Sequence, residues 1–165
     1  MTYGSGLKWK ESQGADRYRR GLYIHFQRTS PYPQLVNFDA PDSRISCPRR
    51  RRSNTPLQAL NLLNDPVFLE AAQGLAERML REAPGDFQDR LGYAFALAIG
   101  RKPNPHELDD LSKYFGEQKA LFEKDEKSMA VVAPYVPEGV SRADLAAWVG
   151  VSRVLTNLDE FITRE

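Results

Sequence analysis

The sequence predicts a mainly α protein, a compact bundle of about five to six helices with a long, ordered loop rich in proline and arginine and no substantial sheet. Three observations lead to this prediction. Apolar residues recur at spacings of three and four along much of the chain, as they do on one face of a helix. Residue types that cap helix ends flank these stretches. Eleven Pro and eleven Gly in 165 residues interrupt them.

A chain of 165 residues has the size of one domain, and we expect a single helical domain over residues 1–165. The expected parts, in chain order, are an extended lead-in (1–15), a first helix (16–28), an ordered loop (30–54), a helical body (55–158) and a tail (159–165).

The first helix is predicted from Tyr18, Leu22 and Phe26, which repeat at the spacing of one helical turn, with Asp16 as its N-cap. Residues 30–54 then contain four Pro and no helical period. We therefore predict an ordered loop, and long loops of this kind are usually functional or held in place by specific side chains.

Local signals place the helices of the body. Asn54 or Thr55 can cap a helix that has Pro56 in its first turn, and Asp65 can cap the next helix, with Pro66 at its first position. We expect the helix that starts at Pro56 to bury one face, which consists of Leu57, Leu60 and Leu63.

The next helix follows Asp86 and is so apolar from residue 91 onward that we expect it to be the central, most buried one. Gly100 ends it, and Asn104 with Glu107 resembles a capping box that starts another helix. Residues 128–140 are predicted to be a loop. The motif Ser141-Arg142-Ala143-Asp144 is predicted to cap the last helix, which buries Leu145, Trp148, Val149, Ser152 and Leu155.

The net charge of +1 is unevenly distributed. Residues 1–56 hold eleven Lys and Arg against four Asp and Glu, a net charge of +7, and residues 57–165 carry −6. Such asymmetry suits an anionic partner for the basic part, or neutralisation of one part by the other.

The cysteine and histidine content limits the chemistry. One Cys and two His exclude a disulfide within the chain and a structural zinc site of the usual four-ligand kind. No Cys-x-x-Cys-His motif for haem occurs, so we expect no cofactor in this chain. No apolar run reaches the roughly 18–20 residues that span a bilayer, and the first residues lack the apolar core of a signal peptide.

Four consecutive arginines, Arg49 to Arg52, directly precede a predicted helix start. Guanidinium groups beside free backbone N–H groups suit a phosphate, sulfate or carboxylate. Alternatively, these arginines bond nearby aspartates and helix carbonyls and hold the loop in place. The candidate anion or interaction loop comprises Asp39, Asp42, Arg49, Arg50, Arg52 and Asn54.

The residues of this loop favour a structural role over a catalytic one. Asp39 and Asp42 could serve as an acid/base pair or bind calcium, but aspartates near proline are typical of turns. Cys47 could be a nucleophile only if His25 or His106 approached it. We therefore predict no catalytic residue and no metal ligand set, and the chain alone is not expected to be an enzyme.

A second polar cluster consists of Asn64, Asp65, Asp159 and Glu160. The three carboxylates could form a metal or substrate site. The alternative is helix capping and hydrogen bonding at helix ends, which such side chains do routinely.

Three segments, YGSGLKWKESQGADRYRRGLY, FDAPDSRISCPRRRRSNTPLQALNLLNDPVF and the terminal NLDEFITRE, resemble the "domain of unknown function 1553" family. His25 and Phe26 depart from the family pattern, which has an aromatic residue followed by Trp, and this argues against a catalytic His25. The positions that match the pattern are Asp39, Pro41, Arg49, Arg50, Arg52, Asn54, Thr55, Pro56, Gln58, Asn64 and Asp65.

The resemblance implies no specific activity. It implies that the chain is the C-terminal portion of a longer bacterial protein of the planctomycete type, whose other parts include a c-type cytochrome domain. It also implies an exported parent, because c-type haem is attached outside the cytoplasm, and a c-type haem in that parent.

Our leading hypothesis is a non-catalytic helical module that packs against upstream domains of the same protein and helps to bind an anionic polysaccharide or a partner protein. The second is a composite active site of a polysaccharide-related or redox enzyme, completed by the upstream domains. The third is binding of single-stranded nucleic acid by the arginines together with Tyr18, Tyr23, Phe26 and Tyr32. The pI of 7.8 ranks this hypothesis last, because a committed nucleic-acid binder is expected near ~9.

Overall fold

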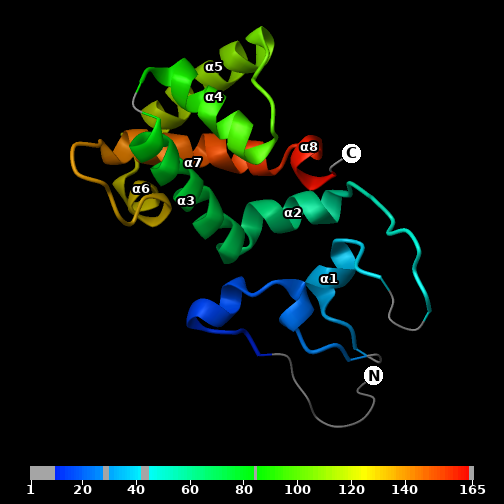
Figure 1. Ribbon diagram of the computed structural model, residues 1–165. Helices are drawn as coiled ribbons and strands as arrows, with labels where there is room; N and C mark the ends of the chain where they lie inside the picture. Colours follow the sequence, from blue (N-terminus) through cyan, green and yellow to red (C-terminus); the bar gives the residue numbers. More distant parts are fainter. Residues whose placement is uncertain (1–9, 28–29, 42–44, 84, 164–165) are drawn as a thin grey trace. The chain divides into compact units, whose positions relative to one another are not determined.

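The structure is a computed structural model that describes residues 10–27, 30–41, 45–83 and 85–163 (Figure 1). Contacts divide the chain into two compact units, residues 1–58 and residues 59–165. Helices make up the regular structure, and the described residues contain no strand. The predicted mainly α fold class is therefore confirmed, whereas the expectation of one domain over the whole chain stays a prediction.

The first helix, expected over residues 16–28, is not formed. Two short 3-10 helices, η1 (Gly14–Tyr18) and η2 (Gly21–Tyr23), occupy the segment instead. A Cβ atom on Gly21 would lie 2.8 Å from a methyl group of Leu35, so any larger residue would require the Leu35 side chain to shift. Glycine also disfavours a continuous helix at this point.

A short helix, α1 (Pro33–Asn37), lies inside the segment predicted to be a loop. Pro33 occupies its first turn, where a proline loses no hydrogen bond. The rest of the described part of residues 30–54 has no regular structure, in line with the predicted ordered loop.

Helix α2 (Pro56–Asn64) begins where it was predicted. The Gln58 N–H donates to Thr55 Oγ1 at 3.2 Å, and the Thr55 N–H donates to Gln58 Oε1 at 2.9 Å. Gln58 is thereby buried at 1% exposure, together with Leu62 at 5%. The expectation of a buried leucine face was wrong, because the helix buries the side with Gln58 and Leu62 instead: Leu57, Leu60 and Leu63 are 59%, 56% and 38% exposed.

The next three helices confirm their predicted caps. They are α3 (Pro66–Glu82), α4 (Phe87–Ala98) and α5 (Pro105–Phe122). Asp65 Oδ1 accepts from the Val67 N–H at 2.9 Å, and Asp86 Oδ1 accepts from the Asp89 N–H at 3.0 Å. Asn104 forms a capping box with the third residue of α5. Gly100 follows α4 with φ +82°, the left-handed conformation that favours glycine after a helix.

Helix α7 (Arg142–Thr156), and not α4, is the central helix of the second unit. Ten of its fifteen residues are buried, against four in α4. It packs most extensively against α3 and α5 and also against α4 and α6, and Figure 1 shows it running between them. Apolar content pointed to α4, but small residues such as Ala146 and Gly150 let α7 approach its neighbours on several sides.

Two short helices complete the second unit. Helix α6 (Glu126–Val132) occupies part of the segment predicted to be a loop, with Asp125 as its N-cap. Helix α8 (Asp159–Ile162) lies in the predicted tail. Ser141 precedes α7 but makes no capping hydrogen bond with its side chain, so the predicted cap is not formed there. Among the described residues, no helix combines the length and the apolar character that crossing a membrane requires.

Candidate functional site

Three side chains from separate parts of the N-terminal unit form a hydrogen-bond network: Asp39, Ser53 and Gln58. The backbone N–H and the hydroxyl of Ser53 both donate to Asp39 Oδ2, at 2.9 and 2.6 Å. Gln58 Nε2 donates to the Asn37 carbonyl at 2.8 Å and to Ser53 Oγ at 3.2 Å. The network connects the end of α1 to the first turn of α2.

Arg50 binds the same turn. Its Nη2 donates to the Phe38 carbonyl at 3.0 Å, and its Nε donates to the Asp39 carbonyl at 3.4 Å. Asp39 has φ +56°, a conformation that aspartate adopts more readily than most residues other than glycine. Arg50 therefore makes the kind of contact that the structural interpretation predicts: an arginine of the run bonds carbonyls at the end of a short helix and holds the loop.

The other arginines of the run are arranged differently. Arg49, Arg51 and Arg52 are exposed, and within the described part of the chain their guanidinium groups have no ion pair or hydrogen bond. Asn54 is also exposed. Asp42 lies outside the described residues. The run therefore combines one arginine used by the fold with three cations that face solvent.

The remaining reactive groups do not form a catalytic arrangement in the part of the chain described. Cys47 is exposed, and its thiol donates to the Arg49 carbonyl at 3.3 Å. His25 is exposed as well, and His106 is exposed at the start of α5. No group of three or more His, Cys, Asp or Glu that could hold a metal is found among the described residues.

The second predicted cluster, Asn64, Asp65, Asp159 and Glu160, is used mainly for helix ends. Asn64 Nδ2 donates to the Leu60 carbonyl at 2.8 Å, and Asp65 caps α3. The Thr163 hydroxyl donates to Asp159 Oδ1 at 3.2 Å. The capping interpretation describes these three residues, and the carboxylates make no shared metal site among the described residues.

Glu160 has a different role, which the sequence did not indicate. Arg101 Nε and Nη2 donate to its carboxylate at 2.7 and 2.8 Å. Arg101 also donates to both oxygens of Glu107, at 2.9 and 2.6 Å, and its guanidinium lies 5.2 Å from the centre of the Phe95 ring. These hydrogen bonds with Arg101 lower the pKa of both Glu107 and Glu160, and the two carboxylates raise the pKa of Arg101.

The family model for PSD1, described as a protein of unknown function (DUF1553), matches residues 1–115. This chain belongs to the DUF1553 family. The matched part of the DUF1553 chain contains the Asp39–Ser53–Gln58 network and the arginine run. It ends before the C-terminal segment NLDEFITRE that also suggested the resemblance. No curated protein and no solved structure matches the chain significantly.

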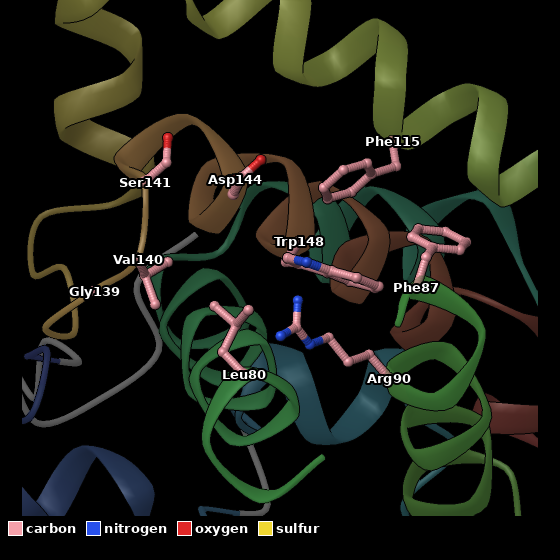
Figure 2. Close-up of a pocket in the computed structure, with 9 residues that line it drawn as sticks. All are labelled: Leu80, Phe87, Arg90, Phe115, Gly139, Val140, Ser141, Asp144 and Trp148. Carbon is pink, nitrogen blue, oxygen red and sulfur yellow. The ribbon is translucent and has the colours of Figure 1, made fainter. Parts of the chain in front are cut away.

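The second unit of this DUF1553 chain contains a pocket of about 250 Å³ that the sequence did not predict (Figure 2). Three aromatic rings form one wall. The Phe87 and Trp148 rings stack with centres 5.0 Å apart and planes at 25°, and the Phe115 ring lies 4.9 Å from Trp148. Leu80, Arg90 and Val140 also line the pocket.

The pocket escaped prediction because its aromatic residues have the spacing of ordinary core residues. Trp148 was expected inside the fold, and it is indeed only 2% exposed. Arg90 follows Phe87 by three residues and therefore lies on the same side of α4. The one sequence signal that could have indicated the pocket was a cation, Arg90, three residues after an aromatic residue of the core, Phe87.

Proposed function

We propose that this DUF1553 chain is a non-catalytic helical interaction module of a larger, exported protein. Its N-terminal unit would bind an acidic, partly apolar protein surface that the upstream domains of the same protein supply. The larger, exported parent rests on the family resemblance. The interaction rests on the residues of the unit itself.

The observation that carries the proposal is the near absence of a core in the N-terminal unit. Gln58 is the only buried residue among those described in residues 10–58. Burial of apolar surface is the main source of folding stability, so hydrogen bonds alone hold this segment weakly. Seven of its large apolar side chains are exposed by 39% to 82%: Tyr18, Leu22, Tyr23, Phe26, Val36, Ile45 and Leu57.

The residue types favour a protein partner over a polysaccharide. Tyrosine, phenylalanine and arginine are enriched at protein interfaces, and tyrosine and arginine are among the residues that dominate the binding energy there. Arg49, Arg51 and Arg52 provide unpaired positive charge beside these apolar side chains in the sequence, and such charge recognises carboxylates. Asp39, in contrast, already accepts two hydrogen bonds from Ser53, so it serves the loop.

The gene provides the first test. An open reading frame that continues upstream of Met1 and encodes a signal peptide supports the proposal. A stop codon directly upstream, with no exported partner encoded beside it, contradicts it.

The second test measures binding between the 165-residue chain and the separately produced upstream domains by calorimetry. Replacing Arg49, Arg51 and Arg52 by Gln should weaken binding at least about tenfold at low salt, since three unpaired charges are removed. The matched control replaces Lys124, Lys127 and Arg142, three exposed cations of the second unit, and should leave binding within about twofold. Equal effects of the two triple variants would refute the role of the arginine run.

A further inference from the structure

The aromatic pocket of the second unit contains hydrogen-bond donors that nothing in the described protein uses. The Trp148 indole N–H has no hydrogen-bond partner among the described residues, and Trp148 lines the pocket. An indole N–H can only donate a hydrogen bond. An acceptor from a bound molecule would satisfy it.

Arg90 adds a positive charge with free donors. Its Nε donates to the Ala83 carbonyl at 3.4 Å, and its two terminal nitrogens have no ion pair or hydrogen bond in the described part of the chain. Figure 2 shows the guanidinium reaching toward the Trp148 ring. A guanidinium with two free terminal nitrogens has the geometry that binds a carboxylate through both oxygens.

The pocket has one carboxylate, and its charge is already compensated. Asp144 Oδ1 lies 2.7 Å from Lys119 Nζ, and in Figure 2 the carboxylate is turned away from Arg90. The polar side chains left over are the Arg90 cation, the Trp148 N–H donor and the Ser141 hydroxyl, which can donate or accept. Since the first two only donate and one of them is charged, the set favours an anion with acceptor oxygens.

The walls and the volume of the pocket indicate what the remainder of the ligand should be. Phe87, Phe115 and Trp148 present a largely apolar, aromatic surface. A pocket of about 250 Å³ is smaller than the roughly 300–1,000 Å³ typical of drug-sized ligands. It suits a molecule with a single ring.

We propose that this pocket binds a small aromatic carboxylate, with the carboxylate on Arg90 and the ring against the aromatic wall. The site is formed entirely by residues of the second unit, so it is independent of the interaction proposed for the N-terminal unit. The Trp148 indole N–H donates to the ligand or becomes covered by it.

Phenylacetate is the probe, and nuclear magnetic resonance of the ¹⁵N-labelled 165-residue chain is the measurement. The sequence has two Trp, so two indole N–H signals are expected, and a Trp9→Phe variant assigns them. Titration should shift the Trp148 signal with a Kd on the order of 1 mM and leave the Trp9 signal in place. No shift of the Trp148 signal up to the solubility limit of the probe would overturn the proposal.

Two comparisons test the carboxylate contact. Phenylacetamide has the same shape without the charge and should bind the wild-type protein at least about tenfold more weakly. Arg90→Gln should weaken phenylacetate binding to a similar degree, whereas Arg142→Gln removes an equal charge outside the pocket and should change it less than about twofold. Equal binding of acid and amide, or equal binding to the two variants, would overturn the proposal. The amide comparison decides the question even if Arg90→Gln fails to fold.

Discussion

Arg101 and Glu160 are 59 residues apart in the sequence and are joined by two hydrogen bonds, of 2.7 and 2.8 Å. The same guanidinium holds both oxygens of Glu107. One side chain after α4 thus connects the start of α5 with α8. A network around one arginine stabilises the fold more than isolated surface ion pairs do. The entropy cost of fixing the arginine side chain arises once, whereas several hydrogen bonds are formed.

Removal of this arginine should destabilise the second unit. Arg101→Gln is expected to lower the melting temperature by roughly 3–6 °C, measured by circular dichroism. Lys113→Gln, which breaks the exposed pair of Lys113 with Asp109 on α5, is the matched control and should lower it by less than about 2 °C. Equal losses would show that the Arg101 network adds nothing to an ordinary surface pair.

The same network predicts a pH dependence. Arg101 lowers the pKa of Glu107 below its ordinary value of 4.5 in the folded protein, so this glutamate stabilises the fold above that pH. The stabilisation is lost as the pH falls through the lowered folded-state pKa.

We therefore expect the melting temperatures of wild type and Glu107→Gln to differ at about pH 6 and to converge as the pH falls below the ordinary glutamate pKa of 4.5. Glu82, whose pKa is lowered to about 2 by its hydrogen bonds, chiefly with Arg78, is present in both proteins and drops out of the comparison. A difference that stays constant over this range would contradict the assignment.

Gln58 should control the order of the loop between α1 and α2. Gln58→Ala removes the acceptor of the Thr55 N–H and the donor to the Asn37 carbonyl, and leaves both groups without their partner. Hydrogen exchange of the Thr55 amide is expected to rise at least about tenfold. Gln88→Ala, at an exposed glutamine of α4, should leave it unchanged. Unchanged exchange in Gln58→Ala would show that the buried side chain does not hold the loop.

Helix α7 should be the least tolerant helix of the second unit. Leu155 is fully buried, and Leu155→Ala is expected to lower the free energy of unfolding by about 2–5 kcal/mol in urea denaturation. Ser152 is equally buried, but its hydroxyl donates to the Trp148 carbonyl of its own helix at 2.9 Å. Ser152→Ala should therefore cost less than about 1 kcal/mol. Similar losses in both variants would contradict the assignment of Leu155 to the core.

The accuracy of the sequence-based predictions depended on how local each signal was. Asp65, Asp86, Asn104 and Gly100 act on the turn next to them, and all four occupy the helix ends that were predicted. The contact of Glu160 with Arg101 depends on how α8 packs, and no pattern within either segment contains that information.

The errors have a related cause. The leucines of α2 identified an apolar face, but periodicity does not say whether anything covers that face. Apolar content singled out α4, although the small side chains of α7, such as Ala146, decide which helix can be surrounded. In the N-terminal segment, the spacing of Tyr18 and Leu22 suggested a helix, but Gly21 lies between them and disfavours a continuous helix.

Neighbouring arginines of one run can have different roles: Arg50 holds the backbone, and the others present charge to solvent. The Arg50 guanidinium serves two backbone carbonyls at the end of α1, while the arginines on either side of it extend into solvent. A variant that neutralises the whole run would alter the path of the backbone and the electrostatic field together. Experiments on the basic segment must therefore leave Arg50 in place if a change in binding is to be attributed to charge.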